Sequence, residues 1–159
     1  MEYIFSAIEV IDIGIEKEKN RRDFYKSVSQ KFDDKALKEL FINLFEWETG
    51  HVAKFTEIRK NVAGSPGSAT FKDDAALYIK SLIGDRLYKE LTSDGFDRIV
   101  KTPLVAIYYS ITFEKDSILL FSELTKYLHP LDKEKVRILI EEEKKHIIYL
   151  TELKSKYEI

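Results

Sequence analysis

The sequence predicts an all-α protein, a four-helix bundle in which a long crossover with a short helix joins two helix hairpins. Three observations lead to this fold. Apolar residues recur at helical spacing over long stretches, and Gly and Pro are few, at 6 and 3 of 159 residues. The two halves of the chain also share a pattern of ionisable residues. This length suits one core, so we expect residues 1–159 to form a single domain.

The first pair of predicted helices occupies the N-terminal part of the chain. Helical periodicity runs over residues 1–31, and Asp33 and Asp34 then offer capping carboxylates to a second helix over residues 35–62. Because so few residues separate the two helices, we expect them to pack as an antiparallel hairpin.

A segment of roughly 40 residues connects this hairpin to the next one. It starts with a loop rich in Gly and Ser at residues 63–70. Residues 73–92 predict a shorter helix, residues 93–95 a break, and residues 96–101 a helical turn. A connection of this length lets the third long helix start from the opposite end of the bundle.

The second pair of predicted helices occupies the C-terminal part of the chain. Thr102 and Pro103 supply a cap and a first-position proline to the third long helix, which continues to about residue 128. We expect His129 and Pro130 to end this helix. Asp132 is expected to cap the fourth helix, which runs to about residue 157.

Composition excludes several classes of function. The net charge is −2 with both signs interspersed, so no basic stripe marks a nucleic-acid surface. The absence of cysteine excludes disulfides, thiol catalysis and a four-cysteine iron centre within this sequence. No apolar run is long enough to span a bilayer, and the N-terminal residues do not have the pattern of a secretory signal. We therefore expect a cytoplasmic protein with no membrane segment.

Each long helix has an apolar face that ionisable residues interrupt near its middle. Steps of three and four residues define one such row per helix. The interrupting residues are Glu18 in the first row, Glu48 and His51 in the second, Glu114 in the third, and Glu143 and His146 in the fourth. Carboxylates without partners in a bundle core would be strongly destabilising, and four of them together would repel one another.

Two arrangements would remove this penalty. The carboxyl groups could be protonated or bonded to other polar groups, or cations could lie among them. Four Glu and two His are the ligand set of a two-metal site in which two helices give one Glu each and two give a Glu-x-x-His pair each. The i, i+3 spacing lets both members of a pair reach one ion. Oxygen donors with one imidazole per metal favour iron or manganese over copper, and zinc also fits.

The two halves of the chain repeat this pattern. Glu18 precedes His51 by 33 positions, and Glu114 precedes His146 by 32. Each half therefore looks like one helix hairpin that carries half of a site.

Four segments resemble the rubrerythrin-like branch of the ferritin-like superfamily. The resemblance covers nearly the whole chain and is weakest in the crossover. The segments are residues 15–18 with Phe24 and Tyr25, residues 44–51, residues 113–116 and residues 142–146. The resemblance implies a ferritin-like bundle with two iron ions. In it, Glu18 and Glu114 are the single-helix carboxylates, either bridging or terminal, and the two Glu-x-x-His pairs are the other ligands.

The resemblance also implies an activity. It favours peroxide reduction or a ferroxidase-like reaction with dioxygen, in a response to oxidative stress. Rubrerythrins receive electrons from a four-cysteine rubredoxin domain, so this chain would need a separate donor such as a rubredoxin. A homodimer is also implied. Two alternatives stay open: an iron or manganese buffer or structural metal site without turnover, and an interaction module whose bundle pairs with a partner.

Acidic residues beside the six candidate ligands have a simpler interpretation. Glu16, Glu46, Glu141 and Glu142 point to other faces of their helices, so we expect them to be solvated. Rubrerythrins have an additional Glu near the metal site. Glu90 lies in the crossover, but no matching motif supports it as that residue.

Other neighbouring residues also have structural interpretations. We interpret Trp47 as a packing or interface residue and His129 as a helix-end residue. Arg21 and Arg22 could balance acidic charge near the site, but surface ion pairs are the simpler interpretation. Tyr25 could hydrogen-bond to a metal-bound carboxylate or oxygen species, or it could be a core tyrosine with its hydroxyl at the rim.

Overall fold

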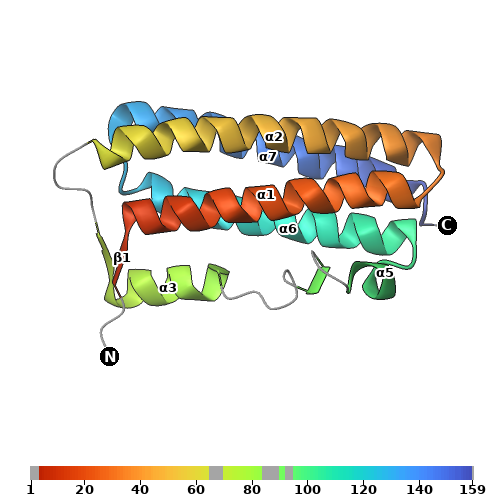
Figure 1. Ribbon diagram of the computed structural model, residues 1–159, viewed down its shortest axis with the longest axis horizontal. Coiled ribbons are helices and arrows are strands. Elements are labelled where there is room, and N and C mark those ends of the chain that lie inside the picture. Colours follow the sequence, from red (N-terminus) through yellow and green to blue (C-terminus); the bar gives the residue numbers. More distant parts are fainter. Residues whose placement is uncertain (1–3, 65–69, 84–89, 92–94, 159) are drawn as a thin grey trace.

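Four long helices form the bundle in the computed structural model, which describes residues 4–64, 70–83, 90–91 and 95–158. They are α1 (Ala7–Lys31), α2 (Lys35–Ala63), α6 (Pro103–Thr125) and α7 (Pro130–Ser155). The helices α1 and α2 form one hairpin, and α6 and α7 form the other (Figure 1). This confirms the predicted all-α bundle.

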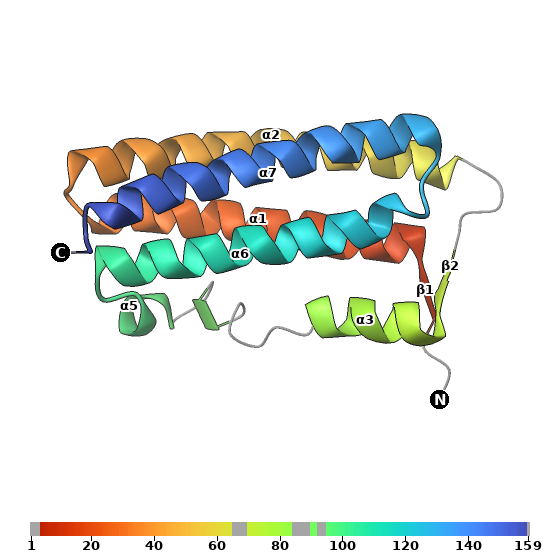
Figure 2. The same ribbon diagram turned by 180° about the vertical axis from the view of Figure 1, so that it is seen from behind.

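The crossover carries the chain from one end of the bundle to the other. It contains β2 (Thr70–Lys72), α3 (Asp73–Ile83) and α5 (Phe96–Ile99). These elements lie along the outside of the α1 and α6 side, and α6 starts at the end of the bundle opposite to the end of α2 (Figure 2). The expected reversal of the third long helix is therefore present.

A short β ribbon was not predicted from the sequence. The strand β1 (Ile4–Ser6) pairs antiparallel with β2, with Ile4 opposite Lys72. The predicted first helix over residues 1–31 is therefore wrong at its start, because α1 begins at Ala7. Ser6 ends the strand and caps the helix in a capping box with Glu9, which fixes the boundary.

Several other boundaries differ from the prediction. The helix α3 ends at Ile83, and most of the remainder of the helix predicted over residues 73–92 lies outside the described residues. Asp34 and Thr102 cap α2 and α6 as predicted. The predicted cap of α7 is wrong, because His129 is its cap and Pro130 its first residue. Proline is well suited to that position, where no backbone N–H is needed.

The core consists of two apolar clusters with a polar layer between them. One cluster lies towards the β ribbon and contains, among others, Ile11, Ile15, Phe55, Phe121 and Leu139. The other lies towards the opposite end and contains, among others, Phe24, Tyr25, Phe41, Phe113 and Leu150. No helix within the described ranges is both long and apolar enough to cross a membrane.

Candidate metal centre

The polar layer contains all six residues that interrupt the apolar rows. Glu18, Glu48, Glu114 and Glu143 are fully buried, and His51 and His146 are 2% and 3% exposed. They come from all four long helices, and each Glu-x-x-His pair lies on one face of α2 or α7. The helical spacing read from the sequence therefore brings the six side chains together. Their role as metal ligands stays a prediction.

The six side chains form two overlapping groups of potential ligands. The His51 group consists of Glu18, Glu48, His51 and Glu143, and the His146 group of Glu48, Glu114, Glu143 and His146. Within each group, one ligand atom of every residue lies within 4.8 Å of the others. Glu48 and Glu143 belong to both groups, whereas Glu18 and Glu114 belong to one each. The shared carboxylates are thus those of the Glu-x-x-His pairs.

The two histidines are surrounded by carboxylates. Nδ1 of His51 lies 2.7 Å from Glu143 Oε1, and its Nε2 lies 2.6 Å from Glu142 Oε2. Burial alone would lower the pKa of His51, but the carboxylates of Glu143 and Glu48 outweigh it and raise that pKa to about 11. The same balance raises the pKa of His146 to about 9. Without metal, both histidines are therefore imidazolium cations, with a proton on each ring nitrogen, at neutral pH.

The buried carboxyl groups respond differently to their surroundings. Burial raises the pKa of Glu18 well above its usual range, and the nearby Arg21 offsets only part of this rise. Burial would also raise the pKa of Glu48, but Arg21 and hydrogen bonds from its neighbours hold it well below its usual range. Burial and the negative charge of Glu48 would both raise the pKa of Glu143. There, Arg21 and the two histidines outweigh them and lower the pKa.

Arg21 lies inside this cluster, so the prediction of a surface ion pair is wrong for it. It is 1% exposed, and its guanidinium forms ion pairs with Glu18, with Glu48 at 3.5 Å and with Glu143 at 3.9 Å. Arg21 follows Glu18 by three residues on the same helical face, which is the signal that the sequence contained. Arg22 pairs with Asp23 at 3.1 Å outside the cluster.

Tyr25 holds one of the candidate ligand carboxylates. Its hydroxyl donates a hydrogen bond of 2.6 Å to Glu114 Oε1, and its side chain is fully buried. Of the two interpretations of Tyr25, the hydrogen bond to a candidate ligand is the correct one. Among the described residues, the two ligand groups do not include Glu90.

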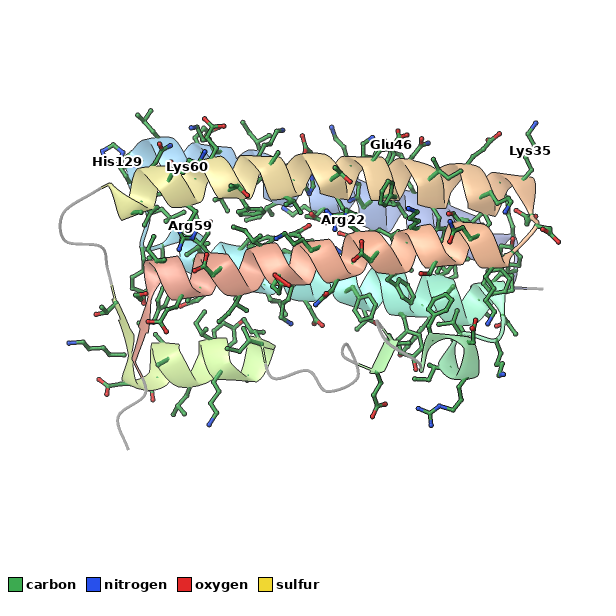
Figure 3. The ribbon with its side chains drawn as sticks, in the orientation of Figure 1. Arg22, Lys35, Glu46, Arg59, Lys60 and His129 are labelled. Atoms are coloured by element: carbon green, nitrogen blue, oxygen red, sulfur yellow. The ribbon has the colours of Figure 1, made fainter. Side chains whose placement is uncertain are left out.

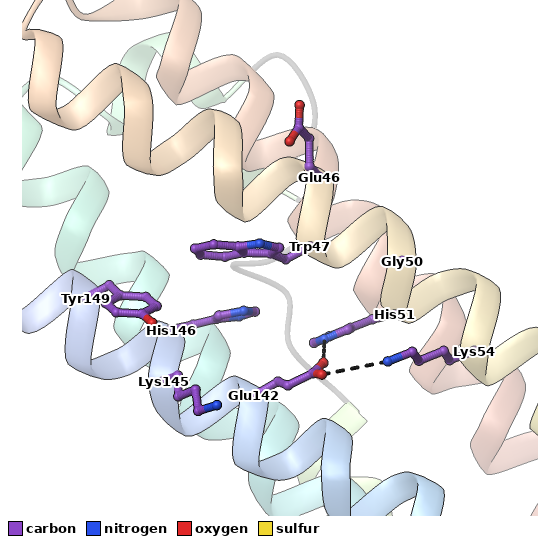
Figure 4. Close-up of a pocket in the computed structure, with 9 residues that line it drawn as sticks. All are labelled: Glu46, Trp47, Gly50, His51, Lys54, Glu142, Lys145, His146 and Tyr149. Carbon is purple, nitrogen blue, oxygen red and sulfur yellow. Dashed lines mark hydrogen bonds and ion pairs between the residues drawn. The ribbon is translucent and has the colours of Figure 1, made fainter.

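A pocket of about 410 Å³ opens between α2 and α7 beside the histidines. Figure 4 shows Glu142 among the residues that line it, with its carboxylate in contact with both His51 and Lys54. Glu142 was expected to be solvated, but it is only partly exposed because it hydrogen-bonds to His51. Trp47 stacks on His146 with ring centroids 5.1 Å apart and planes at 12°, so it packs directly against the cluster.

The remaining neighbours are at the surface, as expected. Glu16, Glu46 and Glu141 are exposed. Figure 3 shows Glu46 and His129 pointing away from the bundle. His129 has a structural role, because its side chain accepts a hydrogen bond from the backbone N–H of Leu131 at the start of α7.

The cluster contains buried polar atoms that need a partner. His146 Nδ1 lies 3.2 Å from Glu48 Oε1 and 3.4 Å from Glu143 Oε2. None of these three atoms, nor Glu114 Oε2, forms a hydrogen bond of normal geometry with any described residue. Buried acceptors of this kind are destabilising unless a donor or a cation reaches them. Carboxylate oxygens and imidazole nitrogens are ligand atoms that suit iron or manganese, so the cluster fits a pair of such ions.

No protein-family model matches the chain, and no curated protein matches its sequence. A solved structure does match it over 98% of both chains, with a TM-score of 0.69 and 22% sequence identity. That structure is of a Thermotoga maritima protein described as a proposed ferritin-like diiron-carboxylate protein. The chain has a ferritin-like fold.

Sequence reasoning missed three residues that contact the candidate ligands in this ferritin-like bundle. Arg21, Trp47 and Glu142 were all assigned to the surface or to packing, yet each touches a histidine or a carboxylate of the cluster. Arg21 and Glu142 are charged, and charged residues on long helices usually face water. Helical spacing indicated the contact of Arg21 alone, since the contacts of Trp47 and Glu142 cross from one hairpin to the other.

Proposed function

We propose that this ferritin-like protein binds two metal ions, iron in the first place, and uses them in a redox reaction with peroxide or dioxygen. The observation that carries the proposal is the pair of overlapping ligand groups, with buried carboxylate oxygens that form no hydrogen bond of normal geometry within the described part of the chain. Support also comes from the fold shared with the Thermotoga maritima protein, and from the resemblance to rubrerythrins.

The residues that would hold the ions are those of the His51 group and the His146 group. Glu48 and Glu143 are common to both groups, so each would contribute to the binding of both ions. An iron pair bound there would exchange two electrons with an oxidant. Manganese and zinc fit the same donors.

The surrounding residues orient these ligands. Glu142 accepts a hydrogen bond from Nε2 of His51, which fixes the imidazole with Nδ1 towards the carboxylates. Tyr25 holds Glu114 in the same way through its hydroxyl. The two apolar clusters enclose the layer from both ends and keep bulk water away from it.

The proposal includes partners that follow from the resemblance. The sequence contains no cysteine, so a four-cysteine iron centre that supplied electrons would belong to a separate donor such as a rubredoxin. A homodimer and a cytoplasmic location complete the proposal.

Metal binding without turnover is the second candidate function, and one observation favours it. The pocket beside the site is lined by His51 and His146 but by none of the four buried glutamates of the two groups. The imidazole rings therefore lie between that pocket and the carboxylates. A small oxidant would have to pass them, whereas a stored ion would be protected by them.

Metal analysis tests the binding itself. Protein purified without chelator is expected to contain Fe or Mn, and to take up about two Fe(II) per chain when loaded anaerobically. Replacing Glu143, which belongs to both groups, by Ala should abolish this uptake, and replacing His146 by Ala should reduce it. The matched control is Glu141→Ala, because Glu141 is exposed on the same helix and pairs with the exposed Lys144 at 2.9 Å. Absence of uptake by the unaltered protein would contradict the proposal.

Rapid mixing separates the two candidate functions. The Fe(II)-loaded protein is mixed with peroxide or with air, and the rate of Fe(II) oxidation is compared with that of free Fe(II). A much faster rate, repeated after re-reduction, is expected for a redox enzyme. Oxidation at the rate of free Fe(II) would favour storage and contradict turnover.

A further inference from the structure

A positive charge is built into the candidate metal centre. The guanidinium of Arg21 pairs with Glu18, Glu48 and Glu143, and it belongs to neither ligand group. It also donates to the backbone carbonyl of Phe113 at 3.0 Å and to the hydroxyl of Ser117, both on α6. These contacts from two sides hold the charge inside the cluster.

Arg21 breaks the repeat between the two halves of the chain. Glu18 in the first half corresponds to Glu114 in the second, since each precedes a histidine of its hairpin by nearly the same number of residues. Three residues after Glu18 the chain has Arg21, whereas three residues after Glu114 it has Ser117. The position three residues after the single-helix glutamate therefore carries a cation in the first half of the chain and a neutral hydroxyl in the second, and these two side chains hydrogen-bond to each other.

The positive charge of Arg21 affects the two ligand groups differently. Arg21 forms an ion pair with Glu18, which belongs to the His51 group alone. Glu114, which belongs to the His146 group alone, is held by the neutral hydroxyl of Tyr25. A divalent ion in the His51 group would therefore lie beside a buried like charge, where repulsion is strong because little water screens it.

Glu142 acts in the opposite direction, because a carboxylate on Nε2 of His51 makes that imidazole a stronger ligand. Its effect is weaker for two reasons. The side chain of Glu142 is 35% exposed, and it also lies 3.7 Å from Lys54. Arg21 is buried and touches the ligand oxygens directly, so its repulsion outweighs the help from Glu142.

We propose that Arg21 is an internal cation that makes the two metal positions unequal, so that a divalent ion fills the His146 group first. The His51 group then fills at a higher metal concentration, and Arg21 has to move away from Glu18. The first ion and Arg21 together offset most of the carboxylate charge, which further weakens the second site. The inference rests on the proposed metal binding.

Nuclear magnetic resonance of the histidine rings can follow the order of filling. The chain has three histidines, of which His51 and His146 each belong to one group, while His129 is exposed at a helix start and serves as the control. The metal-free protein is titrated with zinc, which is diamagnetic. The stack of His146 on Trp47 identifies its signals. The rings of His51 and His146 stack on each other with centroids 5.5 Å apart, so the signals compared are those of the ring nitrogens that bind zinc directly. We expect the His146 nitrogen signal to change first, and that of His51 at a free zinc concentration at least about tenfold higher.

The outcomes distinguish this inference from the proposed function. If both rings respond at the same zinc concentration, or His51 responds first, the inference is overturned and metal binding stands. If neither ring responds and no zinc is bound, the proposed function and the inference both fail.

Variants test the cause of the difference. Arg21→Gln removes the charge and keeps an amide that can donate to Phe113 and Ser117, so the tenfold gap should shrink to about threefold or less. Arg21→Lys keeps the charge and should keep the gap. Arg22→Gln changes the neighbouring surface arginine and should leave it unaltered. An unchanged gap in Arg21→Gln overturns the inference. If Arg21→Gln does not fold without metal, the filling order in the unaltered protein and in Arg21→Lys remains decisive.

Discussion

The hydroxyl of Tyr25 donates a hydrogen bond of 2.6 Å to the buried carboxylate of Glu114. Tyr25→Phe would remove this hydrogen bond from a buried carboxylate oxygen that also lies 3.5 Å from His146 Nδ1. We expect the metal-free protein to lose about 2 kcal/mol of unfolding free energy, measured by denaturant titration. The control is Tyr108→Phe on α6, because the Tyr108 side chain is 62% exposed. Equal stability of the two variants would mean that this hydrogen bond does not contribute.

At the same scale, the sequence was informative where a residue broke a pattern. Glu18 and Glu114 could be singled out because each stands in an otherwise apolar row, and a buried carboxylate demands an explanation. Arg21 and Glu142 could not, since a charged residue beside an apolar row normally reaches water. Their positions depend on which side chain of another helix faces them, and sequence spacing within one helix does not contain that information.

Among the elements, α1 and α6 approach closely at Gly14. A Cβ atom on Gly14 would lie 2.9 Å from Cε1 of Phe121, whose buried ring packs against Phe55 with centroids 4.3 Å apart. Gly14→Ala should therefore destabilise the protein by about 1 kcal/mol, although alanine is the better helix former. The measurement is the free energy of unfolding in denaturant.

Gly50 provides the matched control within α2. A Cβ atom there would have no neighbour within 4 Å. Gly50→Ala should therefore raise the unfolding free energy by about 0.5–1 kcal/mol, through helix propensity alone. Stabilisation by both substitutions would show that α1 and α6 adapt to the added methyl group.

The ends of helices could be predicted only where the residue at the boundary is typical of a helix start or of a helix end, but not of both. Asp34 and Thr102 precede long apolar periods and cap the helices that follow. Proline both ends helices and starts them, so Pro130 could be assigned to the wrong side of a boundary. The strands β1 and β2 have three residues each, which is too short for an alternating pattern to be recognised.

For the whole molecule, the histidines link stability to pH. Their pKa values rise from 6.5 to about 11 for His51 and to about 9 for His146 in the metal-free protein. A histidine whose pKa is higher in the folded than in the unfolded protein stabilises the fold. This stabilisation is complete at pH values below the pKa of the unfolded state, and it is lost as the pH rises through the pKa of the folded state. Metal-free protein should therefore lose stability above about pH 6.5. Metal ligands must be unprotonated, so metal binding should strengthen over the same range.

Thermal unfolding of chelator-treated and zinc-loaded protein between about pH 6.5 and 9 measures both effects. The Tm of the loaded protein should exceed that of the metal-free protein, and the difference should grow with pH. The variant Lys144→Gln, which alters an exposed residue of α7, should show the same growth. A difference that stays constant or shrinks would mean that the imidazoles do not exchange protons for metal.

The polar layer between the two apolar clusters also fixes how the helices align along the bundle axis. Ile, Leu and Phe side chains alone would allow one hairpin to slide past the other with modest loss of contact. A slide of one helical turn here would move Glu114 on α6 away from Tyr25 on α1, and Phe113 and Ser117 away from Arg21. Glu114 would then approach an apolar cluster, where a carboxylate has no partner. The polar layer thus fixes the register of the four helices. The side chains that form the candidate metal centre also determine how the two hairpins pack.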